Sequence, residues 1–293
     1  MGDDLIIRKE KPMEEGSLRL LTYLTPSMPT EYFTLLVQYL ETKLNRHIYL
    51  MVETRSSGPL ADRPDPFSAN EADIAILSST ELDNLFQKAK GFVNLIPAAT
   101  FFAHPGANNR PVYFSDVIIH KDNRDKYKEF HYLHGAKWAF SSKTSVSSYF
   151  RPLYELKKMG QNANYFTKIF ETGSHTKSIE MVLDHTVDGA AVDSIVLGIQ
   201  KKMNSEIRDK IVILKSWGPI TVHPMVINTR LSSDLQRDIS ECLLNMHSDP
   251  EWCPQFSKFN LIKFLPIGIE DYSRDEEVRK GVSEMRLESA VYY

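Results

Sequence analysis

Short apolar runs alternate with helical patterns along most of the chain. From Ser17 onward, runs rich in β-branched and aromatic residues precede segments in which apolar residues recur every three to four positions. Predicted strands cover residues 18–24, 48–52, 73–77, 92–98, 112–119, 137–140, 166–171, 189–192, 211–215 and 225–227. Predicted helices cover residues 30–44, 79–89, 147–159, 174–184, 194–203 and 232–246. This alternation predicts an α/β fold with mainly parallel, helix-covered sheets.

The predicted elements fall into two groups. A turn-rich insert at residues 104–111 interrupts the first group, and the strand–helix rhythm restarts at residue 137. The last strand and helix are too little to fold alone, so we expect them to return to the first group. The predicted division is a flexible arm at 1–16, one lobe from 17–114 and 223–293, and a second lobe from 115–222. The charged run at 271–286 is predicted to be a solvated terminal helix.

Composition and charge exclude several classes of partner. Of 293 residues, 42% are hydrophobic, which is typical of a globular protein. Thirty-five basic residues against 38 acidic ones give a net charge of −3, too balanced for a nucleic-acid binder. Cys242 and Cys253 are interpreted as two buried thiols, and His131 with His134 as a solvated loop. No metal site and no cofactor are predicted, since the common nucleotide-binding glycine motifs are absent as well.

The N-terminal residues carry no recognisable export or anchoring signal. Asp3 and Asp4 stand where a signal peptide has basic residues, and no apolar run long enough to span a membrane follows. The sequence as written therefore predicts a cytoplasmic protein with no membrane insertion. A chain from which a leader had been trimmed would look the same and would be periplasmic or extracellular.

Residues 141–149 are the most informative stretch, because six Ser and Thr residues lie there between a predicted strand and a predicted helix. Backbone N–H groups at a helix start, the positive end of the helix dipole and nearby hydroxyls together favour an oxyanion. The candidate ligand contacts here are Thr144, Ser145 and Ser147. The alternative is a serine-rich loop with one ordinary helix cap.

Two more strand–helix junctions have the same character. Ser174 and His175 follow the strand at 166–171, and His175 can donate to an oxyanion in either protonation state. Ser78 and Ser79 follow the strand at 73–77 in the first lobe. Because ligands bind beyond the carboxyl ends of parallel strands, we expect the three junctions to point to one site. The alternative at 174–175 is a capped helix with a surface histidine.

Two further side chains follow predicted strands. Tyr23 either closes over a ligand or packs in the core. Asp193 is either the N-cap of the following helix or an acceptor for a protonated ligand oxygen or an amine.

An ordered series of short motifs resembles the phosphate, phosphite and phosphonate-binding proteins of ABC transporters. The motifs are Ser57-Gly58-Pro59, Ala72-Asp73-Ile74-Ala75, the stretch from Arg110 to Ile118, Gly135-Ala136-Lys137-Trp138-Ala139, Gly173-Ser174-His175, Val192-Asp193-Ser194 and Gly218-Pro219. The resemblance covers roughly residues 18–230. It implies a two-lobed type II periplasmic-binding-protein fold with a two-strand hinge and an oxyanion clamped in the cleft. It also implies an ABC permease as partner if the chain is exported.

The resemblance assigns roles residue by residue. The family's Ser-x-Ser-Gly-Tyr motif is similar to the stretch from Ser145 to Tyr149, which makes Ser145, Ser147 and His175 the implied ligand contacts. Tyr23, Ser78 and Asp193 are further implied contacts. The chain departs from the family pattern at three positions, namely Val146, where Thr is frequent, Ser148, where Gly is usual, and His223, near an acid that binds a ligand amine.

These patterns predict a non-enzymatic binding protein for a small tetrahedral oxyanion of the phosphonate, phosphite or phosphate type. One alternative is a cytoplasmic enzyme on the same scaffold that acts on a small anion, with His175, Asp193 and His223 as the candidate acids or bases. Another is a regulatory or scaffold relative that has lost the ligand.

Overall fold

The chain folds into two compact units in a computed structural model that describes residues 16–23, 28–55, 57–161 and 163–287. Unit 1 takes its described residues from 1–103, 109–111 and 222–271, and unit 2 from 104–108, 112–221 and 272–293. The predicted flexible arm lies outside the described residues except for Gly16.

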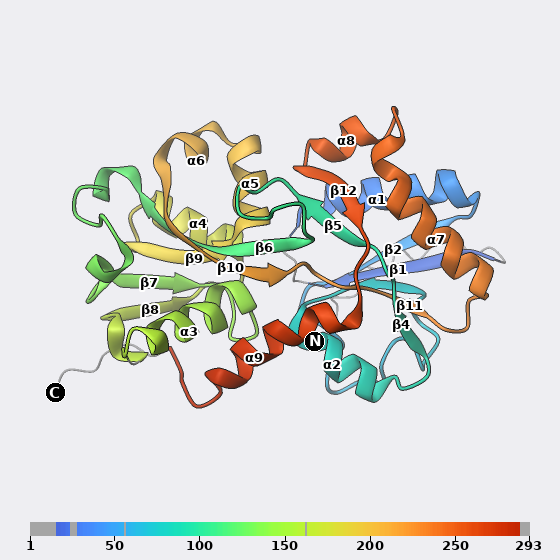
Figure 1. The fold of residues 1–293 in the computed structure, drawn as a ribbon, viewed down its shortest axis with the longest axis horizontal. Coiled ribbons are helices and arrows are strands. Elements are labelled where there is room, and N and C mark those ends of the chain that lie inside the picture. Colours follow the sequence, from blue (N-terminus) through green and yellow to red (C-terminus); the bar gives the residue numbers. More distant parts are fainter. Residues whose placement is uncertain (1–15, 24–27, 56, 162, 288–293) are drawn as a thin grey trace, which may run out of the picture. The chain divides into compact units, whose positions relative to one another are not determined.

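The central sheet of unit 1 has five strands (Figure 1). Their order is β2 (Ile48–Glu53), β1 (Leu18–Tyr23), β3 (Ile74–Ile76), β11 (Met225–Asn228) and β4 (Val93–Leu95). Strand β1 runs parallel to β2 and β3, whereas β11 is antiparallel to β3 and β4. A separate two-stranded sheet pairs β5 (Ala99–Phe102) with β12 (Leu261–Leu265).

Aromatic side chains join the helices of unit 1. These helices are α1 (Thr30–Leu44), α2 (Ser79–Lys88), α7 (Ser233–Asn245) and the short α8 (Cys253–Ser257). Tyr32 and Tyr39 of α1 pack edge-on against Phe256 of α8, with ring centroids 6.3 and 5.7 Å apart. Such large buried rings contribute much of the hydrophobic stabilisation of a core.

Unit 2 also has a five-stranded sheet. The order is β10 (Ile211–Thr221), β6 (Val112–His120), β9 (Gly189–Asp193), β7 (Lys137–Phe140) and β8 (Lys168–Glu171). Strand β7 is parallel to β8 and β9, but β6 is antiparallel to β9 and β10. The prediction of mainly parallel sheets is therefore wrong, and both sheets are mixed. Strands β6, β10 and β11 adjoin the points where the chain passes between units, so no helical crossover orients them parallel to their neighbours.

Helices cover both faces of the unit 2 sheet (Figure 1). One face packs on α4 (His175–Leu183), α5 (Ser194–Met203) and α6 (Ser205–Lys210), and the other on α3 (Arg151–Lys158) and α9 (Ser273–Gly281). Each face has its own hydrophobic core: the first core lies under α4, α5 and α6, and the second lies under α3 and α9. Side chains alternate along a strand, so Ile118 of β6 belongs to the first core, whereas Val117 and Ile119 belong to the second. Both faces of this sheet are consequently apolar, as the continuous hydrophobic runs of the sequence indicate.

Several predicted elements differ from the structure. The predicted strand 92–98 is shorter in the structure, because β4 covers only residues 93–95 and β5 begins after it, at residue 99. The predicted helix 147–159 begins with a π-helical turn, η3 (Val146–Phe150), before α3. Short elements such as α6, α8 and β12 were not predicted. Cys242 and Cys253 are free thiols, as expected, but they are half-buried rather than buried.

The C-terminal segment groups with unit 2, whereas the predicted division placed it in the first lobe. Helix α9 lies within the predicted terminal helix, but it is not simply a solvated helix. Val278 is buried, and Val282, just after α9, belongs to the second core of unit 2. The Asp275 carboxylate accepts a hydrogen bond from the Thr221 N–H at 3.2 Å. These apolar and polar contacts attach the segment to unit 2.

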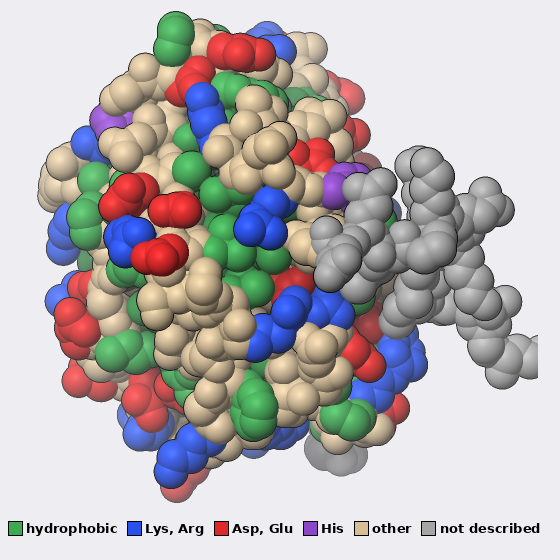
Figure 2. All heavy atoms as spheres, turned by 90° about the vertical axis from the view of Figure 1, so that its right-hand side faces the viewer, with side chains coloured by type: hydrophobic (Ala, Val, Ile, Leu, Met, Phe, Trp, Pro, Cys, Tyr) green, Lys and Arg blue, Asp and Glu red, His purple; other side chains and the backbone are tan. Residues whose placement is uncertain are grey.

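Charged side chains of both signs are interspersed on the face shown in Figure 2, in keeping with the near-balanced net charge. Among the described residues, no helix has the length and apolar character needed to cross a membrane.

Candidate functional site

Three strand ends of unit 2 bring polar helix starts together. The parallel strands β7, β8 and β9 lead to η3, α4 and α5. The Gly173 N–H donates to the Ser141 carbonyl at 2.8 Å, and the Thr172 N–H donates to the Phe140 carbonyl at 2.9 Å. The hydroxyl-rich stretch after β7 and the Gly-Ser-His stretch after β8 are therefore adjacent, as predicted for these two junctions.

Ser145 organises the first junction. Its hydroxyl accepts a hydrogen bond from the Ser148 N–H at 3.1 Å, and its carbonyl accepts from the N–H groups of both Tyr149 and Phe150 at 3.1 Å. The resulting π-type turn is a rare local geometry that is frequent at functional sites. The first N–H groups of a helix have no intrahelical acceptor, and the dipole makes this end positive. The junction thus combines the features that favour an anion.

Ser147 and Thr144 differ in their surroundings. Ser147 is buried; its carbonyl accepts a hydrogen bond from the Ser115 hydroxyl at 2.5 Å, and its side chain hydrogen-bonds to Tyr113. Thr144 is exposed, with its hydroxyl 3.1 Å from that of Ser142. Ser147 is therefore part of the buried junction, whereas Thr144 lies at the surface.

Ser148, where the resembled family usually has glycine, has a structural role. Its hydroxyl accepts a hydrogen bond from the Ser141 N–H at 3.0 Å and lies 2.6 Å from the Ser141 hydroxyl. The side chain is fully buried. It connects the two ends of the loop between β7 and η3.

His175 is a buried, neutral hydrogen-bond donor. It is the first residue of α4 and is only 3% exposed, so the surface-histidine interpretation is wrong. Burial lowers the pKa of its imidazole to about 4. Its Nδ1 accepts a hydrogen bond from the Asp193 N–H at 3.2 Å. A neutral imidazole whose Nδ1 accepts carries its proton on Nε2, which leaves Nε2–H as a donor.

Asp193 and Ser174 are helix caps, in agreement with the simpler of the two interpretations for each. The Asp193 carboxylate accepts from the N–H groups of Ile195 and Val196 at 2.7 and 3.4 Å. Burial, with a smaller contribution from the charge of Asp116, raises the pKa of Asp193 to about 8. The carboxyl is therefore protonated near neutral pH. Ser174 accepts from the Lys177 N–H at 3.1 Å and is half-buried.

Strand β6 supplies polar groups that sequence reasoning missed. Ser115, Asp116 and Tyr113 are all nearly fully buried. Burial raises the pKa of Asp116 to about 6, and the Ser216 hydroxyl donates to its carboxylate at 2.6 Å. The sequence does contain a sign of these groups, namely the pair Ser115-Asp116 inside an otherwise apolar strand. Polar residues buried in such a strand require hydrogen-bond partners, which indicates a polar cluster at that point.

The unit 1 candidates lie at the ends of its parallel strands. Tyr23 ends β1 and is 5% exposed, and burial raises the pKa of its phenol. Ser78 caps α2; its hydroxyl accepts from the Thr80 N–H at 3.4 Å and lies 2.9 Å from the Thr80 hydroxyl. Ser79 is half-buried in the first turn of α2. His223, the residue near the implied amine-binding position, is buried in unit 1.

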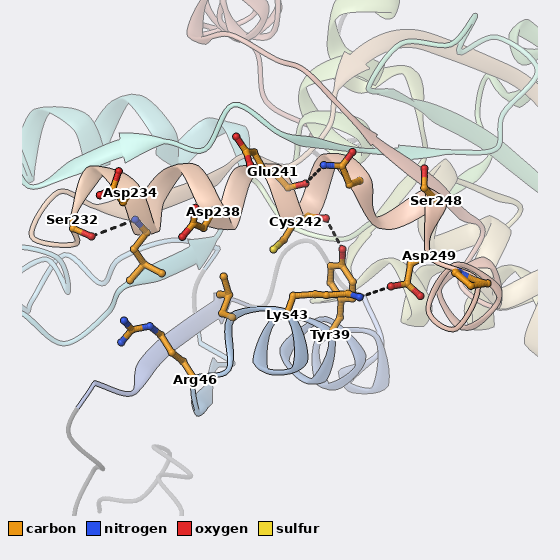
Figure 3. Close-up of a pocket in the computed structure, with 14 residues that line it drawn as sticks. Tyr39, Lys43, Arg46, Ser232, Asp234, Asp238, Glu241, Cys242, Ser248 and Asp249 are labelled. Carbon is orange, nitrogen blue, oxygen red and sulfur yellow. Dashed lines mark hydrogen bonds and ion pairs between the residues drawn. The ribbon is translucent and has the colours of Figure 1, made fainter.

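A separate hollow of about 750 Å³ lies between α1 and α7 of unit 1 (Figure 3). Two pairs of its lining groups contact each other: the Lys43 ammonium lies 2.5 Å from the Asp249 carboxylate, and the Tyr39 hydroxyl donates to the Cys242 carbonyl at 2.5 Å. None of the predicted ligand contacts lines this hollow.

Comparison with protein families and solved structures identifies relatives of the chain. A family described as "ABC transporter, phosphonate, periplasmic substrate-binding protein" matches residues 20–272. PhnD1 from Prochlorococcus marinus, solved in complex with methylphosphonate, is 15% identical over 92% of this chain and 99% of its own, with a TM-score of 0.74. A binding protein component of an ABC phosphonate transporter from Pseudomonas aeruginosa is 13% identical over 92% of this chain and 89% of its own, with a TM-score of 0.72.

A third solved structure has a different ligand class. The periplasmic aliphatic sulphonate binding protein SsuA from Escherichia coli is 11% identical over 95% of this chain and 92% of its own, with a TM-score of 0.58. At these identities the structural likeness establishes the fold, which is the predicted type II periplasmic-binding-protein fold. Comparison with curated protein sequences gives no significant match.

Proposed function

This chain belongs to the periplasmic substrate-binding proteins of phosphonate ABC transporters, and we propose that it binds a small tetrahedral oxyanion of the phosphonate, phosphite or phosphate type. Proteins of this family bind small ligands and work with an ABC permease; they are not enzymes, as predicted. The family is periplasmic, and the cytoplasmic prediction finds no support in the match.

The observation that carries the proposal is the tautomer of His175. With Nδ1 occupied by the Asp193 N–H, the buried ring offers a neutral Nε2–H donor at the junction shared with η3. A neutral donor stays a donor across the physiological pH range, because the pKa of His175 is lowered to about 4. The start of η3 adds the positive end of a helix dipole.

Protonation of Asp193 removes a negative charge that would repel an anionic ligand near His175. Its pKa of about 8 keeps the buried carboxyl uncharged near neutral pH. A protonated carboxyl also has an O–H to donate, whereas a carboxylate can only accept. The proposed site therefore holds an anion with uncharged donors and a helix terminus.

The ligand contacts proposed for unit 2 are Ser145, Ser147, Thr144, Ser174, His175 and Asp193. Of these, Thr144 and Ser174 have the weakest support, since one is exposed and the other is a cap. Tyr23, Ser78 and Ser79 of unit 1 stay predictions of the family resemblance, each to be tested by its own substitution.

The decisive experiment is a thermal-shift and calorimetric comparison of methylphosphonate, phosphite, phosphate, sulfate and an alkyl sulfonate. A ligand that binds only the folded state raises the melting temperature, and the shift grows with the logarithm of the ligand concentration divided by its Kd. We expect one or more phosphorus oxyanions to give a saturable shift. Binding of the sulfonate alone would contradict the proposed ligand class. If no compound binds, the alternative that this chain is a regulatory or scaffold protein without a ligand would be favoured.

A further inference from the structure

Three potential metal ligands meet at one end of strand β6. His120, the last residue of β6, and Asp122 lie within 4.8 Å of His185 when the closest ligand atoms are compared. The Asp122 Oδ2 is 3.4 Å from the His120 Nδ1 and 4.0 Å from the His185 Nε2. The two imidazole rings have centroids 4.0 Å apart.

These distances are close to those of a tetrahedral zinc site. Ligand atoms about 2.0–2.1 Å from a shared Zn²⁺ lie about 3.3–3.4 Å from each other. The contact between Asp122 and His120 already has this spacing. The contact between Asp122 and His185 requires a shift of less than about 1 Å, and the ligand atoms of the two histidines, which lie within 4.8 Å of each other, require a shift of at most about 1.5 Å. Asp122 is 64% and His185 49% exposed, so they can make these shifts.

His120 is in a state suited to ligation. It is buried at the end of β6, and its Nδ1 accepts a hydrogen bond from the Asp122 N–H at 3.2 Å, so this nitrogen carries a lone pair. A metal bound at Nδ1 would replace that hydrogen bond.

His185 has a backbone conformation that is unusual for its residue type. It follows α4 with φ +61°, a left-handed conformation that a helix end normally gives to glycine or asparagine. A histidine tolerates this position at some cost, and here the ring lies against His120. Conformations of this kind concentrate at functional positions.

Nearby lysines oppose a cation, but acidic groups offset them. The charges of Lys121 and Lys210 act on His120. The Lys210 ammonium is 2.5 Å from the Glu206 carboxylate, and the charge of Lys121 acts on Asp209. The local field therefore does not exclude a divalent ion.

We propose that His120, Asp122 and His185 form a binding site for a divalent transition cation of the Zn²⁺ class, with water completing the coordination. Two imidazoles and one carboxylate suit Zn²⁺ better than Mg²⁺ or Ca²⁺, which prefer oxygen ligands. The site is distinct from the proposed anion site, because five residues of β6, or about 17 Å, separate His120 from Ser115. It departs from the sequence expectation of no metal.

Calorimetric titration of the full chain with ZnCl₂ tests the proposal, near neutral pH, without a polyhistidine tag and in a buffer free of phosphate. We expect one Zn²⁺ per chain. His185→Asn and Asp122→Asn should each weaken binding by at least about tenfold. Asparagine tolerates the left-handed conformation at 185, so His185→Asn should fold normally.

The matched control is His47→Asn in unit 1. His47 also has a carboxylate at hydrogen-bond distance, with Nδ1 2.6 Å from the Glu41 Oε1, but it is not part of a group of three ligands among the described residues. Zinc affinity should be unchanged in this variant. The proposal is overturned if the parent chain does not bind Zn²⁺ saturably, or if His185→Asn binds Zn²⁺ as tightly as the parent chain. It is also overturned if His47→Asn loses as much Zn²⁺ affinity as His185→Asn.

Discussion

His175 and Asp193 are joined through the backbone of one residue and the ring of the other: the Asp193 N–H donates to the His175 Nδ1 at 3.2 Å. This hydrogen bond connects the start of α4 to the end of β9. It assigns the tautomer of a buried histidine and so decides which of its nitrogens can donate to a ligand.

Replacement of His175 by alanine should weaken oxyanion binding by about 10- to 100-fold. A hydrogen bond to a charged partner contributes about 1.5–3 kcal/mol, and each 1.4 kcal/mol is about tenfold in affinity. Calorimetry with the oxyanion that binds the parent chain measures this loss. His131→Ala, at an exposed position of the same unit, should leave the affinity unchanged. An unaltered dissociation constant in His175→Ala would remove His175 from the site.

Combined replacement of Ser145 and Ser147 by alanine should reduce binding and lower the melting temperature. The stability loss follows from the cap, because the Ser145 hydroxyl accepts from the Ser148 N–H and losing an N-cap costs about 0.5–2 kcal/mol. Ser232→Ala removes a similar cap from α7 in unit 1, where the hydroxyl accepts from the Leu235 N–H at 3.3 Å. This control should lower stability without altering affinity. If the double variant keeps full affinity, the two serines are not ligand contacts.

Oxyanion affinity should fall as pH rises through about 8. The pKa of Asp193 is raised to about 8 in the folded chain, so the carboxyl is neutral below this pH and repels an anion above it. Affinity measured from pH 6 to 9 should show this decrease, beyond the change caused by ionisation of the ligand itself. Asp193→Asn keeps a helix-capping side chain and cannot ionise, so its pH profile should retain only the ligand's ionisation. Identical profiles for the two proteins would contradict this role of Asp193.

Stability should also decrease with pH because of Asp193. Its folded pKa lies above the unfolded value of 3.8, so the folded chain binds more protons between about pH 4 and 8, and the free energy of unfolding falls over this range. Asp193→Asn should show a smaller decrease when both proteins are unfolded by urea at several pH values. An equal decrease would mean that other groups cause the pH dependence.

Asp73 should be the most sensitive charged residue of unit 1. It is fully buried, accepts from Arg19 at 2.8 Å through the backbone N–H and at 3.0 Å through Nε, and pairs with Arg230. Asp73→Ala leaves these donors without their carboxylate and should cost about 3–5 kcal/mol in urea unfolding. Asp234→Ala, which removes an exposed partner of Arg237, should change stability by less than about 1 kcal/mol.

Local sequence patterns were sufficient to predict the main elements and the two polar strand–helix junctions of unit 2 at Ser145 and His175. Helix α1 was predicted at its observed bounds, and β7, α5 and the motif around His175 were placed within a residue or two, because hydrophobic periodicity and capping residues are local properties. The family resemblance rests on the same local motifs. The identity of the fold followed from them.

The burial, hydrogen-bond partners and protonation of individual side chains follow from the folded arrangement and not from local sequence. The hydrogen bond between His175 and Asp193 joins residues 18 positions apart. The Ser115 hydroxyl, inside β6, donates to the carbonyl of Ser147, which lies in the junction after β7. The antiparallel course of β6 and the joining of His120 to His185 were likewise invisible in the sequence. Periodicity reports which face of an element is buried, but pKa values, tautomers and ligand clusters depend on neighbours that the fold alone brings together.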